Sequence, residues 1–249
     1  MNETMITLVT GANKGIGRQI AAQLGTLGHV VYVGARNAGL GEKAAAELRE
    51  DGIKATSVVL DVTDPASAAV AAAEIGTRHG RLDALVNNAG ISGPAGSDPG
   101  SQRPSTADLD VLRAIFETNY FGVIAVTNAM LPLLRRSAWP RIVNVSSSAG
   151  SLSLNANLER GDGPSIPVSA GYVTSKTALT ALTLQYARDL LPDGIKVNAV
   201  CPGYVATDLN GHRGYRTPAE GAAAAVRMAT IGADGPTGTF TDDKGPAPW

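Results

Sequence analysis

The sequence is poor in side chains that bind metals or form disulfides. It has one cysteine, Cys201, and three histidines in 249 residues. The single cysteine excludes a disulfide within the chain, and the histidines are too scattered to join it in a zinc-ligand spacing. They are His29, His79 and His212. We therefore expect no metal site, and core packing is the expected role of Cys201 at the end of an apolar run.

The chain also lacks a strong charge of either sign. Its 21 Lys and Arg residues against 22 Asp and Glu residues give a formal net charge of -1, without a basic cluster. Nucleic acids and anionic membrane surfaces attract concentrated basic fields, so neither partner is expected. No run approaches the roughly 18 apolar residues that span a bilayer, and residues 1–8 lack the features of a secretory signal. We therefore expect a soluble, cytoplasmic protein.

What the chain does have is an alternation of apolar, strand-like runs with alanine-rich helical stretches. A hydrophobic share of 44% in 249 residues suffices for one large core, so residues 1–249 are expected to form a single domain. Alternation of this kind is typical of repeated βαβ units around a buried parallel sheet. The predicted fold class is therefore α/β, a doubly wound (Rossmann) parallel sheet of seven strands.

The predicted elements follow from the positions of these runs. Strands are expected at residues 5–10, 29–35, 55–60, 84–87, 141–146 and 196–201, with a weakly patterned last strand near Thr239. Helices are expected at residues 15–27, 40–49, 65–78, 107–135, 170–190 and 218–231. Asp64-Pro65 and Thr217-Pro218 are typical helix starts, because the first side chain can accept a free backbone N–H and proline fits the first helical position.

Two segments interrupt this alternation, residues 92–105, rich in Gly, Pro and Ser, and residues 151–169. Both are expected to be loops at the rim of the sheet. Loops of this length are uncommon in a compact domain and more often functional than not, although disordered decoration is the alternative.

The first predicted strand runs directly into a glycine-rich turn and a helix start, the run TGANKGIG of residues 10–17. This order directs backbone N–H groups and the helix dipole at the phosphates of a dinucleotide. The spacing G-x3-G-x-G departs from the G-x-G-x-x-G fingerprint. The glycines alone are therefore also compatible with a tight turn that binds nothing. The candidate cofactor residues in this turn are Gly11, Asn13, Lys14, Gly15, Ile16 and Gly17.

The residue after the second predicted strand distinguishes NAD from NADP. An acidic residue there binds the ribose hydroxyls in NAD enzymes, whereas a basic residue binds the 2′-phosphate in NADP enzymes. This chain has Arg36 and no acid nearby, and Lys14 adds a second positive charge. The sequence therefore predicts NADP(H), with solvated surface side chains as the alternative for both residues.

Further short motifs follow in a fixed order along the chain. They are Asn87-Asn88-Ala89-Gly90, Asn119, Ser146-Ser147-Ser148, Tyr172 with Lys176 four residues later, and Pro202-Gly203. Together with the glycine turn, this ordered set resembles the short-chain dehydrogenase/reductase family of the non-extended type, from residue 5 to about residue 249. No single motif is specific, and the combination carries the resemblance.

Four features are most similar to the monomeric carbonyl reductase branch of that family, which includes menthone and salutaridine reductases. They are Asn13-Lys14, the insertion before Tyr172, the run GYVATD at 203–208 and the run TPAEGA at 217–222. Ser147 and Tyr172 are 25 positions apart, farther than in common family members. In that branch a similar insertion covers the helix face otherwise used for tetramer contacts. The resemblance therefore predicts a monomer, which a light-scattering mass would test.

The resemblance assigns Asn119, Ser147, Tyr172 and Lys176 to catalysis. Reducing a ketone requires hydride at the carbonyl carbon and a proton for the developing oxyanion. Tyr172 is the candidate acid, and because its unperturbed pKa is about 10 it needs a neighbouring positive charge. Lys176 lies four residues later, on the same helix face, and can supply that charge. The resemblance further implies that Lys176 binds the nicotinamide ribose, that Ser147 binds the substrate oxygen and that the Asn119 backbone holds a water.

Several of these candidates have a structural alternative. At least two serines of the triplet are expected to serve turns and helix caps, and the assignment of Ser147 could slip by one position. Asn119 could be an ordinary polar residue within a helix. The resemblance also implies cofactor contacts for Asp61, Val62, Asn88, Val205 and Thr207. For Asp61, turn capping is almost as good an explanation.

The expected function is reversible, NADPH-dependent reduction of a ketone or aldehyde to an alcohol. The alternative is a non-catalytic NADP(H)-binding redox sensor or regulator of the same fold. A third interpretation, an epimerase of the extended family type, is not favoured, because it would need a longer substrate domain after Lys176. The expected pocket walls are 92–100, 204–215 and the insertion before the tyrosine. Their residues Asn155, Leu158, Pro167, Tyr204 and Tyr215 predict a mostly apolar carbonyl compound without identifying it.

Overall fold

The computed structural model describes residues 4–157 and 166–249. Seven strands form one sheet in the order β3-β2-β1-β4-β5-β6-β7, and each neighbouring pair is parallel. Their bounds are β1 Ile6–Thr10, β2 Val30–Ala35, β3 Ala55–Val59, β4 Ala84–Asn87, β5 Arg141–Val145, β6 Lys196–Val200 and β7 Phe240–Thr241. The predicted doubly wound sheet is therefore confirmed, and the first six strands end within one residue of their predicted bounds.

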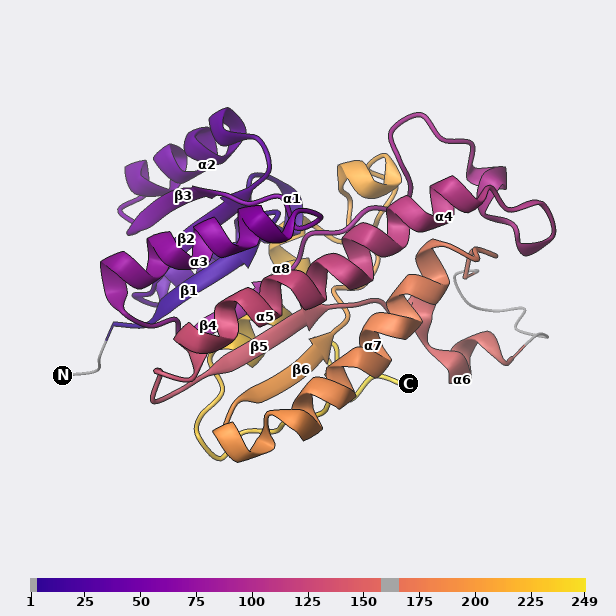
Figure 1. Ribbon diagram of the computed structural model, residues 1–249. Coiled ribbons are helices and arrows are strands. Elements are labelled where there is room, and N and C mark those ends of the chain that lie inside the picture. Colours follow the sequence, from indigo (N-terminus) through magenta and orange to yellow (C-terminus); the bar gives the residue numbers. More distant parts are fainter. Residues whose placement is uncertain (1–3, 158–165) are drawn as a thin grey trace.

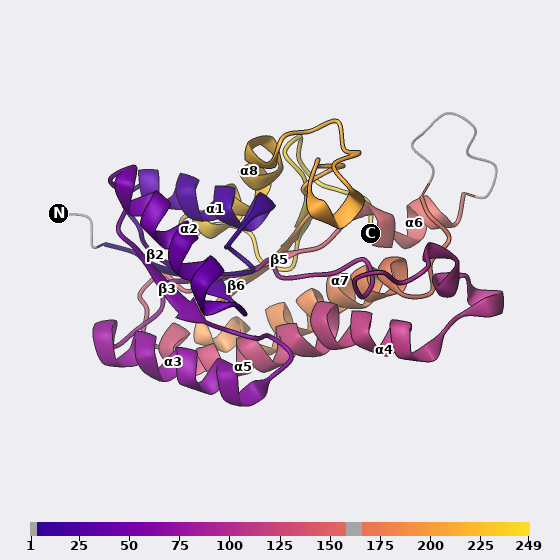
Figure 2. The ribbon, with the colours of Figure 1, turned by 90° about the horizontal axis from the view of Figure 1, so that it is seen from above.

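Helices cover both faces of this sheet. On one face lie α1 Gly15–Thr26, α2 Ala38–Glu50 and α8 Pro218–Ala229, and on the other α3 Pro65–His79, α5 Gly122–Leu134 and α7 Tyr172–Asp189 (Figure 2). Two further helices, α4 Leu109–Phe116 and α6 Leu152–Asn155, extend past the sheet at the end toward which the strands point (Figure 1). The functional candidates gather at this end.

Burial of both sheet faces explains why the strands are apolar at consecutive positions. Successive strand side chains point to opposite faces. In β1, Val9 belongs to a cluster with Ile20 of α1, whereas the adjacent Leu8 belongs to a second cluster with Ile75 of α3. All four side chains are fully buried.

The predicted helix starts at α3 and α8 are confirmed. The Asp64 carboxylate accepts a hydrogen bond from the Ala66 amide at 2.9 Å. The Thr217 hydroxyl accepts one from the Glu220 amide at 3.2 Å, and the Glu220 carboxylate in turn accepts from the Thr217 amide at 2.7 Å. This reciprocal capping box fixes the point at which α8 begins.

The predicted helix 107–135 is wrong as one continuous α-helix. A π-helical turn, η3 Glu117–Phe121, separates α4 from α5. Within it, Asn119 is fully buried and its side-chain amide bonds the main chain of Ile91. A π-turn accommodates an extra residue and is frequent at functional sites, but the hydrophobic period of the sequence does not reveal it.

The two segments predicted as loops contain short helices, so that prediction is wrong in part. The first holds the 3-10 turns η1 Pro99–Gln102 and η2 Pro104–Thr106, and the second holds α6. Local caps account for them: the Asp98 carboxylate accepts from the Gly100 amide at 2.9 Å, and the Ser151 hydroxyl accepts from the Leu154 amide at 3.2 Å. Residues 158–165, with the predicted pocket residue Leu158, lie outside the described residues.

A buried histidine at the opposite end of the sheet makes stability depend on pH. His29 is 6% exposed, and its Nδ1 lies 2.8 Å from the Thr7 hydroxyl. Burial lowers the pKa of His29 below its ordinary 6.5, against an opposing effect of Asp83. As pH falls below 6.5, the unfolded chain therefore binds a proton at His29 more readily than the folded chain does, which lowers the stability of the folded chain.

We expect the free energy of unfolding to decrease on acidification from about pH 7.5 to 5.5, and to decrease less in His29→Gln. Urea unfolding of both proteins at the two pH values measures this. An equal loss of stability in wild type and His29→Gln would contradict the prediction.

Candidate active site

The strand order reverses between β1 and β4, and the candidate site lies at the carboxyl ends of these strands. β1 continues into the glycine turn and α1, whereas β4 leads into residues 88–108. Doubly wound sheets bind ligands in the crevice at this switch point. The topology thus brings the glycine turn, Asn88 and the serines after β5 to one edge.

The glycine turn is tightly packed against the end of β4. Gly11 and Gly15 have φ angles of 62° and 57°, which favour glycine. A Cβ atom on Gly17 would lie 2.4 Å from Asn88 Nδ2 and 2.5 Å from the Gly11 oxygen. Asn88 Nδ2 donates to the Thr10 oxygen at 2.9 Å. The turn therefore needs glycine at these places to bring the start of α1 against the sheet.

The start of α1 suits an anion. In the described structure its N-cap residue, Lys14, makes no side-chain cap bond, and the first turn of the helix holds no acidic residue. Free N–H groups and the positive end of the helix dipole therefore remain for phosphate oxygens. The predicted turn residues Asn13 and Ile16 flank Lys14 and Gly15 in this same turn. These residues fit a dinucleotide.

Two basic residues stand near this turn. Arg36 follows β2 and is exposed, and within residues 4–157 and 166–249 its guanidinium has no ion pair or side-chain hydrogen bond. The Lys14 ammonium forms an exposed ion pair with Asp208 at 2.5 Å. Asp208 also contacts His212 at 2.8 Å, and both neighbours lower the pKa of its carboxyl group, Lys14 most.

The predicted adenosine residues after β3 have structural roles in this state. One carboxylate oxygen of Asp61 accepts from the Thr63 amide at 3.0 Å and from its hydroxyl at 2.7 Å, which is turn capping. Val62 is 9% exposed and packs in the core. Their contacts with an adenosine stay a prediction.

Tyr172, Lys176 and Ser147 lie together at the carboxyl end of β5. Tyr172 is the first residue of α7, and the Lys176 ammonium one turn later lies 5.9 Å from the centre of its ring. That ammonium donates to the Val145 oxygen at 2.9 Å. The Ser147 hydroxyl is close enough to the Tyr172 phenol to lower its pKa. The three predicted groups are thus adjacent.

Burial changes the acidity of this pair. It raises the pKa of Tyr172 to about 12, although the Ser147 hydrogen bond opposes the rise. It lowers the pKa of Lys176 to about 8. The phenol is therefore protonated at neutral pH and can donate a proton, and the ammonium beside it is charged below about pH 8.

The neighbouring serines have structural partners. The Ser146 hydroxyl is buried and lies 2.8 Å from the Thr180 hydroxyl of α7. The Ser148 amide donates to the Cys201 sulfur at 3.2 Å. Ser147 is the serine of the three that acts on the pKa of Tyr172, and its hydroxyl also accepts from the Ala149 amide at 3.1 Å. Its contact with a substrate stays a prediction.

Asn119 joins the loop after β4 to α7. Its side-chain oxygen accepts from the Ile91 amide and its nitrogen donates to the Ile91 oxygen, both at 2.9 Å. The same nitrogen donates to the Ser175 hydroxyl at 3.0 Å. Asn119 is therefore more than an isolated polar residue in a helix, because it fixes the wall behind Lys176.

Residues 204–216, here called the lid segment, cross over the glycine turn. Val205 is buried, and the Thr207 methyl group would lie 3.6 Å from a Cβ atom on Gly15. The Ser92 hydroxyl donates to the Leu209 oxygen at 2.9 Å. The lid segment therefore contacts both the predicted cofactor turn and the predicted substrate wall.

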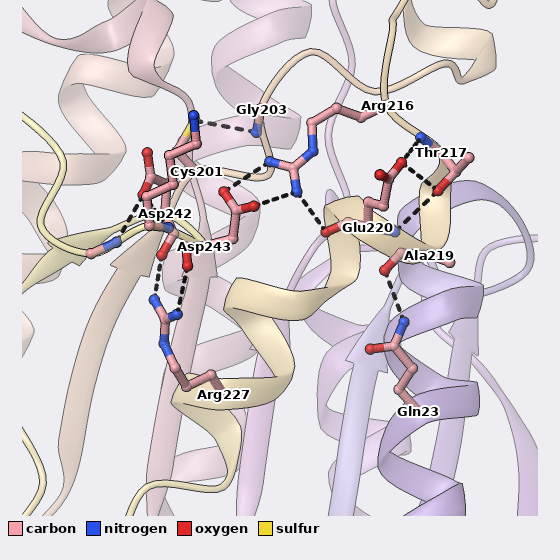
Figure 3. Close-up of polar contacts among 12 residues, drawn as sticks. Gln23, Cys201, Gly203, Arg216, Thr217, Ala219, Glu220, Arg227, Asp242 and Asp243 are labelled. Atoms are coloured by element: carbon pink, nitrogen blue, oxygen red, sulfur yellow. Dashed lines mark hydrogen bonds and ion pairs between the residues drawn. The ribbon is translucent and has the colours of Figure 1, made fainter.

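An ion pair holds the base of the lid segment, and sequence reasoning missed it. The Arg216 guanidinium donates to both carboxylate oxygens of Asp243 at 2.9 and 2.7 Å (Figure 3). It also donates to the main-chain oxygen of Glu220 at 3.1 Å. The Cys201 sulfur accepts from the Gly203 amide at 3.4 Å beside it. The Arg216–Asp243 ion pair joins positions 27 residues apart, so no local pattern could indicate it.

The expected pocket residues differ in what they contact. Tyr204 and Tyr215 of the lid segment have ring centres 6.1 Å apart and are 42% and 76% exposed. Pro167 is also exposed. The Asn155 side chain is engaged locally, since it donates to the Ala149 and Ser151 oxygens at 2.7 Å. The lid segment thus presents two exposed aromatic rings.

Within residues 4–157 and 166–249, the helices are all too short or too polar to cross a membrane. In the same residues, no group of three or more His, Cys, Asp or Glu side chains is placed to hold a metal ion.

Known proteins share this arrangement. A family model described as short chain dehydrogenase matches residues 5–216. Short-chain dehydrogenase/reductase 1 of Saponaria officinalis is 36% identical over 280 residues, which cover 94% of this chain and 92% of that protein. (-)-Isopiperitenone reductase of Mentha piperita is 35% identical over 304 residues, covering 94% of each. The structure of salutaridine reductase from Papaver somniferum is similar with a TM-score of 0.79 at 33% identity, over 96% of this chain and 99% of that one.

Proposed function

The chain belongs to the short-chain dehydrogenase/reductase family, in the branch of the menthone and salutaridine reductases, and we propose that it is an NADPH-dependent reductase of ketones or aldehydes. Family membership makes it an oxidoreductase that uses a nicotinamide cofactor. The observation that carries the proposal is the partly buried Tyr172 phenol, which lies beside Ser147 and next to the Lys176 ammonium.

The side chains of the site support a separate role for each residue in the reduction. When bound, the cofactor of this family supplies the hydride for the carbonyl carbon. Ser147 and Tyr172 would donate hydrogen bonds to the carbonyl oxygen, and the proton would pass from the Tyr172 hydroxyl to that oxygen. The Lys176 ammonium would stabilise the phenolate left behind. Asn119 would keep the loop after β4 and α7 in place around Lys176.

Arg36 and Lys14 support the choice of NADPH. Both are exposed cations beside the predicted phosphate site, and hydrogen bonds to charged groups contribute about 1.5–3 kcal/mol. We expect Arg36→Ala and Lys14→Ala each to weaken NADPH binding about tenfold to a hundredfold, with little change for NADH. Fluorescence titration of both cofactors measures this.

Lys43→Ala is the matched control for these variants, because Lys43 is an exposed lysine on α2. It should leave the affinity for both cofactors unchanged. Preference of the unmodified protein for NADH, or an equal loss of affinity for NADH and NADPH in the variants, would contradict the proposed cofactor.

The direct test of the function is NADPH consumption with a range of carbonyl compounds. Aromatic ketones, cyclic terpenoid ketones, quinones and keto esters cover the apolar class that Tyr204 and Tyr215 favour. Turnover of at least one class is expected. Tight NADPH binding without turnover of any would instead favour a non-catalytic sensor. A monomeric state and a cytoplasmic location stay predictions from the sequence.

A further inference from the structure

The candidate acid lies at a helix start that its own N-cap residue cannot cap. Tyr172 is the first residue of α7, and its N-cap is Gly171, which has no side chain with which to cap. The first N–H groups of a helix have no partner inside it, so an uncapped first turn frays. Lys176 is one turn farther in and is held separately by the Val145 oxygen. Fraying would therefore move Tyr172 away from Lys176.

Gln102, from the first interrupting segment, helps to cap this helix start. Its Oε1 accepts from the Tyr172 amide at 3.0 Å and from the Ser169 hydroxyl at 2.6 Å. The Ser169 oxygen itself accepts from the Tyr172 amide at 2.8 Å. Gln102 is 8% exposed although its neighbours are polar loop residues. Two side chains from different segments thus share one helix-start amide.

The other end of the same side chain reaches the predicted substrate wall. Gln102 Nε2 donates to the Ser92 oxygen at 2.6 Å. The Gln102 main-chain oxygen accepts from the Ala170 amide at 2.7 Å. A Cβ atom on Gly171 would lie 2.8 Å from Gln102 Oε1, so glycine is what allows this close approach. The contacts fix the orientation of the amide, with its oxygen toward α7 and its nitrogen toward Ser92.

We propose that Gln102 is a positioning residue that holds Tyr172 in register with Ser147 and Lys176 and couples it to the substrate wall at Ser92. This inference rests on the proposed function, because it concerns the placement of the proposed acid. A misplacement of about 1 Å can lower a rate a hundredfold, which is a larger change in free energy than the loss of one cap typically causes.

The test compares Gln102→Ala with wild type in carbonyl reduction. We expect kcat to fall about tenfold to a hundredfold, while the Kd for NADPH stays within about twofold because the glycine turn is untouched. Gln185→Ala, an exposed glutamine on the same helix, is the matched control and should keep the wild-type kcat. Hydrogen exchange of a peptide covering Ala170 to Ser175 should rise in Gln102→Ala only.

Gln102→Glu gives a readout that a merely structural role would not move. A neutral carboxyl group can accept from the Tyr172 amide and donate to Ser92, whereas a carboxylate cannot donate, and burial favours the neutral form. The ratio of its kcat to that of wild type should therefore fall as pH rises, toward the ratio of Gln102→Ala. This comparison remains decisive if Gln102→Ala does not fold.

Two outcomes would overturn the inference: a folded Gln102→Ala with wild-type kcat, or a Gln102→Glu whose kcat ratio is independent of pH. Absence of turnover in the unmodified protein would overturn the proposed function instead. Unchanged hydrogen exchange at the start of α7 in Gln102→Ala would show that Gln102 does not cap this helix, whatever the activity.

Discussion

Tyr172→Phe should lower kcat for carbonyl reduction about a thousandfold and leave the Kd for NADPH within about twofold. The substitution removes one oxygen from a partly buried side chain and keeps the ring beside Lys176. Ser147 can still donate to the substrate oxygen, but no group remains to deliver the proton. By transition-state arithmetic, a thousandfold loss raises the barrier by about 4 kcal/mol.

Steady-state kinetics and NADPH titration check this expectation, and α7 contains its own control. Tyr186 lies on the same helix, and burial raises its pKa to about 12 as well. Its hydroxyl donates to Asn128 of α5 at 2.8 Å, and it lies nearly four helical turns after Tyr172. Tyr186→Phe should therefore keep the wild-type kcat. A Tyr172→Phe protein with kcat near that of wild type would exclude Tyr172 as the acid.

The sheet and the sites at its strand ends could be predicted because both depend on local sequence. Strands buried on both faces are apolar throughout, and a doubly wound sheet places the turn after each strand at one edge. The glycine turn follows from its position after the first strand, whereas the resemblance to the family assigns Ser147 and Tyr172. Lys176 follows from the helical period, which sets it one turn after Tyr172.

Contacts between distant segments could not be predicted in the same way. Gln102 lies 70 residues before Tyr172 in a Gly, Pro and Ser rich stretch that resembles any surface loop. Arg216 and Asp243 are 27 residues apart, and neither stands in a motif. The π-turn at Asn119 depends on a bond to Ile91, 28 residues earlier. Each of these arises from tertiary packing, which periodicity does not encode.

Lys176→Met should lower kcat about a hundredfold or more, because it removes the charge that stabilises the Tyr172 phenolate. Methionine is similar in length and suits a site that is 5% exposed, but it leaves the Val145 oxygen without its donor. An unpaired buried acceptor costs about 1–3 kcal/mol, so thermal unfolding must accompany the kinetics. Lys43→Met, on the exposed face of α2, is the control and should keep the wild-type kcat.

The pH dependence of the wild-type reaction tests the same charge without any substitution. Burial lowers the pKa of Lys176 to about 8, so the ammonium is present below that pH and is lost above it. The rate of carbonyl reduction should therefore decrease as pH rises through about 8. Tyr172 cannot account for this decrease, because burial raises its pKa to about 12 and it stays protonated throughout. A folded Lys176→Met should show no decrease near pH 8, and a decrease retained in that variant would show that another group titrates.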